Sequence, residues 1–177
     1  MAVDRSSVLL GSGVLYLEEF DSVAGISDDT ALEVADNQVG RIQGGASLEY
    51  KPEEYEVMDD MGEVVKRFIT KEEATFKSGI LTWAMENLAK LAPAAFTSDA
   101  TEKTITIGGA QSLTSYALRF VHTKDDATKL RITMVATAGS GFTLTFEGKK
   151  ETVIDAEFKA LSQSDGTLVE IREEIPV

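Results

Sequence analysis

The chain has 177 residues, with 30 Asp and Glu against 17 Lys and Arg and a formal net charge of −13, and this length predicts a single domain around one hydrophobic core. The charge disfavours proteins that hold nucleic acid by neutralising its phosphates, and it disfavours attachment to anionic lipid. Because the sequence has no cysteine and one histidine, His122, it excludes disulfides, thiolate metal sites, iron–sulfur clusters and sites with two or more imidazoles.

The first residues show no targeting pattern. Residues 1–5 contain a charge pair and lead into glycine-punctuated sequence, without the basic and apolar regions of a signal peptide. No stretch approaches the roughly 18 apolar residues of a membrane-spanning helix. We therefore expect a soluble intracellular protein.

Most of the chain alternates apolar and polar residues with the period of two that is typical of β-strands. Ile154, Ala156 and Phe158, for example, share one parity of their run. The runs expected to form strands are residues 7–20, 45–57, 63–76, 104–107, 115–123, 130–136, 142–146, 152–161 and 167–171. Asp165-Gly166 lies between the last two runs and predicts a β-hairpin there.

One segment, residues 80–92, has the period of an amphipathic helix. Its apolar stripe consists of Leu81, Ala84, Leu88, Leu91 and Ala92. We expect Ser78 or Thr82 to cap the helix and Pro93 to end it, and we expect Trp83 to be a core residue, with an exposed partner anchor as the alternative. One short helix among many strands predicts a helix that packs on a sheet face or closes the end of a sandwich, because a doubly wound parallel sheet needs several helices.

The negative charge is concentrated in residues 28–63, which hold eleven acidic residues against Arg41 and Lys51. Within this region, residues 51–62 (KPEEYEVMDDMG) predict a polar inter-strand loop bounded by proline and glycine. Such a loop is long for a hairpin turn, and long ordered loops are often functional.

Motifs that carry chemistry are missing or incomplete. We expect His122 to be structural or exposed and not a general base, and there is no Gly-x-Ser-x-Gly elbow or phosphate-binding glycine fingerprint. The acids of residues 53–60 lack the register of an EF-hand loop, and no pair of acids stands out as a glycosidase pair. We expect no enzymatic activity, no cofactor and no metal site, with an irregular weak cation site and a small hydrolase as open alternatives.

A small acidic β-protein with several strand edges and no catalytic constellation is suited to self-assembly. Unpaired edges are a hazard in a monomer, but they become useful when neighbouring copies complete one another's sheets. A head-to-tail contact that rotates by a fraction of a turn closes into a ring, and rings with complementary faces stack into a tube.

Several segments, taken in chain order, carry a family resemblance. They are residues 11–16 (GSGVLY), 44–50 (GGASLEY), the acidic stretch followed by 64–69 (VVKRFI), the helix around 83–91, and 157–161 (EFKAL) with 165–168 (DGTL). Together they resemble the tail tube (major tail) proteins of long-tailed bacteriophages and prophages, in element order over nearly the whole chain.

The resemblance implies a β-sandwich or partly open barrel with one flanking α-helix. It also implies homo-hexameric rings whose inner strands merge into a continuous barrel and which stack into the tube through which the genome passes. The implied partners are further copies of the chain, the tape measure protein, the tail terminator and baseplate or tip proteins. The implied location is the virion tail, with the host cytoplasm during assembly.

Two alternatives remain beside this resemblance. The inner tubes of contractile tails and of type VI-like secretion systems share the architecture and are the nearest alternative. A non-enzymatic β-sandwich module that binds carbohydrate or a cell surface is the other.

The tube hypothesis selects candidate site residues. Acidic walls repel a passing DNA duplex whereas basic walls retain it, so Glu49 and Glu157 are candidates to face the lumen. The ring-stacking candidates in the predicted loop are Glu53, Glu54, Glu56, Met58, Asp59, Asp60 and Met61. Basic partners on the next ring are expected among Lys124, Lys129, Lys149 and Lys150.

Overall fold

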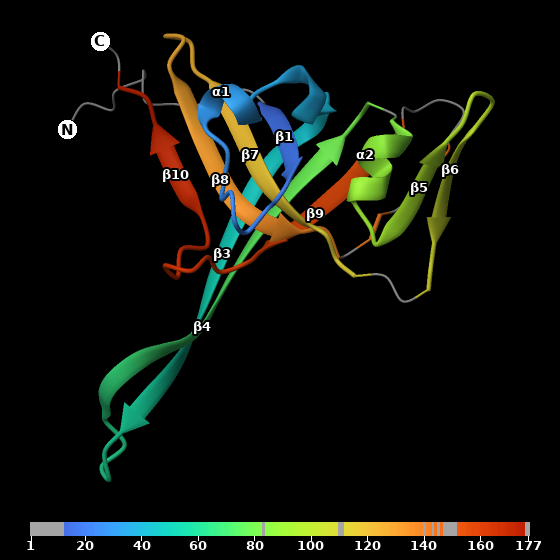
Figure 1. Ribbon diagram of the computed structural model, residues 1–177. Coiled ribbons are helices and arrows are strands. Elements are labelled where there is room, and N and C mark those ends of the chain that lie inside the picture. Colours follow the sequence, from blue (N-terminus) through green and yellow to red (C-terminus); the bar gives the residue numbers. More distant parts are fainter. Residues whose placement is uncertain are drawn as a thin grey trace.

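The computed structural model describes residues 13–82, 84–109, 112–139, 141–142, 144, 146 and 152–175, and within them the expected mainly β fold is confirmed (Figure 1). The helical elements are α1 (Asp29–Leu32), the short 3-10 helix η2 (Ala35–Asn37) and α2 (Met85–Lys90). The strands are β1 (Val14–Glu19), β2 (Gln38–Gly40), β3 (Ile42–Met58), β4 (Val64–Ile80), β5 (Ala94–Ser98), β6 (Lys103–Ile107), β7 (Ser115–Thr123), β8 (Lys129–Thr137), β9 (Ile154–Ala160) and β10 (Glu170–Glu173).

The main sheet is antiparallel, and it curls so that the two strands at its ends, β2 and β3, follow each other in the chain and are joined by a bend. Its order is β2-β1-β7-β8-β9-β4-β3, with β10 also paired to β8, yet Arg41 alone separates β2 from β3 in the chain. At this bend Gly40 has a φ of 127°, and a Cβ there would lie 2.6 Å from the Cβ of Thr82. The Arg41 amide donates to Thr82 Oγ1 at 2.9 Å. The result is a partly open barrel.

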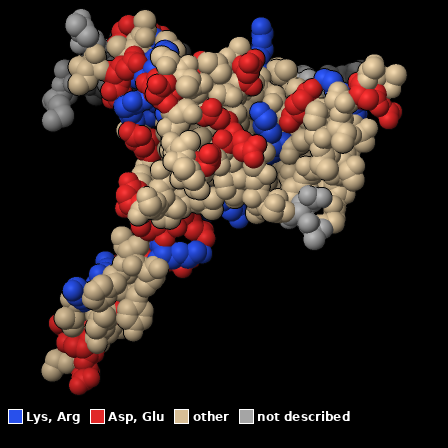
Figure 2. Space-filling model, in the orientation of Figure 1, with Lys and Arg blue, Asp and Glu red and all other residues tan. Residues whose placement is uncertain are grey.

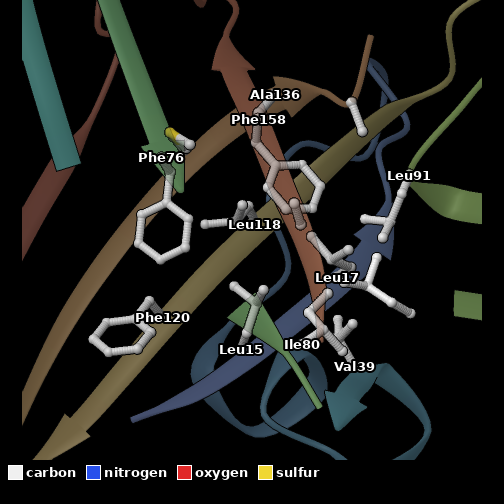
Figure 3. Packing of buried hydrophobic residues seen from close by; sticks show 14 of the residues in the cluster. Leu15, Leu17, Val39, Phe76, Ile80, Leu91, Leu118, Phe120, Ala136 and Phe158 are labelled. Carbon is white, nitrogen blue, oxygen red and sulfur yellow. The ribbon is translucent and has the colours of Figure 1, made fainter. Parts of the chain in front are cut away.

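The inner face of this curled sheet holds the core (Figure 3). Phe76 of β4 and Phe120 of β7 are separated by β8 and β9 in the sheet order, but their ring centroids lie 5.6 Å apart across the interior. Alternation explains the packing, because successive strand residues point to opposite faces and one parity of each strand is apolar. The other fully buried members include Leu15, Leu17, Val39, Ile80, Leu118, Met134, Ile154 and Phe158.

Helix α2 is shorter than the predicted helix of residues 80–92, because β4 continues to Ile80. Neither expected cap is used: Ser78 is buried within β4, and the Thr82 hydroxyl accepts from the Arg41 amide. The apolar stripe nevertheless packs as expected, with Leu88 and Leu91 in the core. Trp83 lies outside the described residues.

The outer face of β7 and β8 is also buried, which the sequence did not predict. Segment 28–37, with α1, covers it, and the buried guanidiniums of Arg119 and Arg131 meet acids there. Arg119 Nη1 lies 2.7 Å from Asp29 Oδ1, and Arg131 Nε lies 2.5 Å from Glu33 Oε1. Arg131 Nη1 also lies 2.5 Å from Glu174 Oε1, so the cluster ties segment 28–37 and the segment after β10 to the sheet.

Two strand expectations near the C-terminus are wrong. The turn at Asp165-Gly166 forms, with the Gly166 amide donating to the Gln163 carbonyl at 2.9 Å, but β10 pairs with β8 and not with β9. Both partners lie along the same side of β8, since β9 takes Ala136 and Thr137 while β10 takes residues 130–133. The described residues of the run 142–146 lie outside the strands, although Phe142 and Leu144 pack against the core.

The predicted loop at residues 51–62 is also wrong. Residues 51–58 continue β3 and pair with β4, so only residues 59–63 form a turn. Proline and acids suggested a loop, but Pro52 lies in the terminal strand of the sheet order, where a missing N–H is tolerated when it points away from the paired strand.

Candidate assembly interface

A long β-hairpin projects from the barrel (Figure 1). The pairing of β4 with β9 ends at Thr75 and Lys159, so that beyond this point β3 and β4 have no third strand among the described residues. We call residues 51–73 the arm. All of them are exposed except Glu56, which is half-buried, and eight strand residues at about 3.3 Å each give the arm a length of roughly 26 Å.

One side of the outer arm is aromatic. Tyr55 pairs with Phe68 and Val57 with Lys66, so these four side chains share a face, which we call the aromatic face. Tyr55 is 62% exposed and Phe68 46%. The Lys66 ammonium lies 4.5 Å from the Phe68 ring centroid and contributes a cation–π contact. All four side chains are exposed.

The opposite side of the outer arm mixes charged residues with exposed apolar ones, among them Met58 and Ile69. Glu56 pairs with Arg67, whose Nε lies 2.8 Å from Glu56 Oε1, and Glu54 pairs with Ile69. Figure 2 shows acidic side chains at the tip and along the arm, with basic ones between them. The arm holds eight acids and four bases, so negative charge remains after pairing.

The tip is an ordered turn. Asp59 Oδ1 accepts hydrogen bonds from the amides of Met61 and Glu63, both at 2.9 Å, and Gly62 adopts a φ of 81°. Asp59 therefore shapes the turn. Among the other predicted stacking residues, Asp60, Met58 and Met61 are exposed, and Met61 is exposed by 89%.

The two lumen candidates lie on one surface. Glu49 and Glu157 line a shallow depression of about 180 Å³ on the outer face of β3, β4 and β9. We call this surface the mixed-charge face, because it consists of Glu49, Lys51, Glu73, Thr75, Lys77, Glu157 and Lys159. Three acids meet three lysines, so this face is balanced and not acidic as expected.

The charges of the mixed-charge face pair with one another. Lys51 Nζ lies 2.7 Å from Glu49 Oε1, and Lys77 Nζ lies 3.3 Å from Glu157 Oε2. The hydrogen bond between Lys51 and Glu49 lowers the pKa of Glu49 and raises the pKa of Lys51. Both groups therefore stay ionised near neutral pH. Along β3, Tyr55 and Val57 have the same parity as Glu49, so the aromatic face is the outer continuation of the mixed-charge face.

The two predicted basic partners that the structure describes, Lys124 and Lys129, already form ion pairs within the chain. Lys124 forms an ion pair with Glu173, and Lys129 Nζ lies 3.1 Å from Glu33 Oε2. Lys149 and Lys150 lie outside the described residues.

Other candidate chemistry is sparse. His122 is buried in β7. Within the described ranges, no group of three or more His, Asp or Glu side chains is arranged to hold a metal ion, and no helix is long and apolar enough to cross a membrane. Comparison with protein-family models and with curated proteins finds no match to this chain.

The sequence interpretation missed the aromatic face. Val64, Val65, Phe68 and Ile69 were expected in a strand of residues 63–76, and they do lie in β4, but all four are exposed on the arm, with Phe68 on the aromatic face. A signal was present: strand-forming runs of similar length flank the turn residues 59–63, which is the pattern of a hairpin. The alternation does not show whether the apolar face of a strand packs against this chain's own core or against another surface.

Proposed function

We propose that this protein is a structural subunit that assembles with copies of itself into stacked rings forming a bacteriophage tail tube, the conduit for the genome. The observation that carries the proposal is the arm, a hairpin that leaves the barrel with its aromatic face uncovered. On this proposal the arm docks on a copy in the next ring. The hexameric ring number and the tape measure, terminator and baseplate partners come from the family resemblance.

The energetics of the arm support a partner. A two-stranded hairpin without a third strand is marginally stable in water. The arm nevertheless keeps exposed strand formers in its outer half, among them the two aromatic residues Tyr55 and Phe68, which face each other across the strands. Burying one large apolar side chain contributes about 1.5–3 kcal/mol, so covering Tyr55 and Phe68 against a second copy favours association. Tyrosine, phenylalanine and methionine are also enriched at protein interfaces.

The mixed-charge face supports the role of a conduit. Lysines on the wall of a DNA conduit would retain the duplex if they released their counterions and bound its phosphates instead. Lys51 and Lys77 already have carboxylate partners on this face, so their charge is neutralised within the chain. A wall of this kind offers the duplex little net attraction.

The test is the state of association of the purified full-length protein. Light scattering after size-exclusion chromatography and negative-stain microscopy should detect rings or tubes. The double variant Tyr55→Ser with Phe68→Ser should remain monomeric at the same concentration. Val23→Ser is the control, because Val23 is an exposed apolar residue on the body, 92% accessible. A wild type that stays monomeric at all concentrations and salt conditions contradicts the proposal.

A carbohydrate-binding module is the second candidate, because exposed aromatic rings also serve as platforms for sugars. Tyr55 and Phe68 lie side by side on the aromatic face. Glycan-array binding that is lost in the same double variant, in a protein that does not self-associate, would favour this function.

A further inference from the structure

No third strand among the described residues pairs with either edge of the arm, and both edges are interrupted near the same place. On the β3 edge, the interruption is Pro52, which has no N–H and cannot donate to an added strand. On the β4 edge, Thr70 is an extra residue, since Glu53 pairs with Lys71 while Glu54 pairs with Ile69. Thr70 Oγ1 donates to the Glu53 carbonyl at 3.2 Å within this bulge.

Backbone direction places Pro52 on the outer edge. The residues that flank β3 show which positions direct their backbone groups toward β4. The Arg41 carbonyl accepts from the Leu81 amide and the Asp59 amide donates to the Glu63 carbonyl, so odd-numbered positions at both ends of β3 face β4. Gly44 and Gly45 form a bulge of two extra residues in β3. Because two is an even number, odd-numbered residues face β4 on both sides of this bulge. Even-numbered residues of β3 therefore direct their N–H and C=O groups away from β4. Leu48 and Tyr50 present a donor there, and Pro52 does not.

The β4 edge is blunted differently. It is free from Val64 to Ala74, because pairing with β9 begins at Thr75. A second extra residue, Val65, lies between the pairs of Lys66 and Val64. Bulges break the ladder, bend the strand and increase its twist, and charged side chains such as Lys66 further discourage an added strand.

We propose that Pro52 and the Thr70 bulge close both edges of the arm to strand addition by a second copy of this chain. A second copy then contacts the faces of the arm, and a strand added to the β3 edge cannot extend past Pro52. The inference rests on the proposed function, because it specifies how copies of the arm meet. Protection is needed here, since the segment 64–70 (VVKRFIT) is rich in strand formers and an assembly brings many identical arms together.

The experiment restores the edges. The variants are Pro52→Ser, Pro52→Val, deletion of Thr70, and Pro52→Val combined with that deletion. Pro93→Ser is the matched control, because it also adds an N–H but lies after α2, away from the arm. Thioflavin T fluorescence and electron microscopy follow each protein over time at equal concentration, and near-ultraviolet circular dichroism confirms that the barrel is folded.

We expect the combined variant to form thioflavin-positive fibres severalfold faster than the wild type and Pro93→Ser, and Pro52→Ser to shift in the same direction. Pro52→Ser adds a donor without an apolar side chain at an exposed site, so it decides the question if the deletion variant fails to fold. No change in fibre formation for folded Pro52→Ser and Pro52→Val overturns the inference. A monomeric wild type overturns the proposed function separately, because the fibre comparison can still be made on monomers.

Discussion

At the scale of single residues, the clearest pattern is the buried charge cluster beneath segment 28–37. Arg119 and Arg131 are buried on the outer face of the sheet, and Glu33 is 9% exposed at its side chain. Charges this far from water are tolerated only when they are paired and hydrogen-bonded. The cluster thus fixes a helical segment that has few apolar residues of its own.

Breaking the cluster at its centre should be costly. Arg131→Met leaves Glu33 buried without its main partner, and loss of one member of a buried pair costs about 3 kcal/mol. Arg172→Met removes an exposed contact to Asp29 and should cost about 0–1 kcal/mol. Urea denaturation of both variants measures the difference. Equal losses in the free energy of unfolding would show that burial does not determine how much an ion pair of this cluster contributes to stability.

Stability should also fall in acid. Burial of Asp29 and Glu33 opposes their ionisation, but hydrogen bonds from Arg172 and Arg131, together with the positive charges of the neighbouring Arg and Lys side chains, lower the pKa of both carboxyls. Because each folded-state pKa lies below the unfolded value of about 4, this stabilisation is complete above about pH 5 and is lost as pH falls through the folded pKa. Denaturation midpoints between pH 6 and pH 3 should fall more steeply for the wild type than for Arg131→Met. Parallel curves would contradict this.

At the scale of elements, alternation located the strands that cover the core. The run 115–123 matches the bounds of β7; its even positions Leu118 and Phe120 lie in the core, while the odd position Arg119 is buried on the outer face. Alternation did not reveal pairing, so the turn at Asp165-Gly166 was expected to join β9 to β10. It also missed α1, whose four residues are too few for a periodic signal and whose position depends on the Asp28 cap and the buried arginines.

Sequence reasoning located the arm but predicted a loop where the structure has a strand. The acidic stretch was expected to be an excursion between two strands, for which an assembly role was only a hypothesis, and Pro52 made it look like a loop. In the structure the same proline is compatible with a strand because it stands on a free edge. The apolar residues opposite the acidic stretch then belong to an exposed surface and not to the core.

Removing the outer arm should leave the barrel intact. Replacing residues 54–70 by a two-residue Asn-Gly turn connects the paired residues Glu53 and Lys71, deletes the outer arm and leaves Phe76 and Leu48 in place. We expect a thermal unfolding midpoint close to that of the wild type and complete loss of association. Calorimetry and light scattering measure the two effects. Loss of the folded barrel would show that the arm contributes to the core.

At the scale of the whole molecule, charge is distributed unevenly. The net charge is −13, yet the mixed-charge face balances three acids with three lysines. The acidic surface expected around Glu49 and Glu157 is therefore a mixed one, in which Lys51 and Lys77 pair with carboxylates. Composition gives the total charge but not its pairing, which depends on the register between β3, β4 and β9.

Removing the carboxylates should make this face retain DNA. Glu49→Gln with Glu157→Gln frees Lys51 and Lys77 from their partners. We expect fluorescence anisotropy to detect binding of a labelled duplex at low salt by this double variant and not by the wild type, with the binding weakened by added salt. Glu102→Gln with Asp125→Asn changes the net charge equally at exposed turns and should behave as the wild type. Equal binding by both double variants would show that pairing on this face is irrelevant.

The account depends on the aromatic face of one copy meeting another copy. Photo-crosslinking from p-benzoylphenylalanine in place of Phe68 tests it most directly, with light and heavy isotope-labelled proteins mixed before assembly. We predict that mass spectrometry will find cross-linked peptides joining a light chain to a heavy chain. Cross-links found only within one chain, in a sample that forms rings or tubes, would contradict the account.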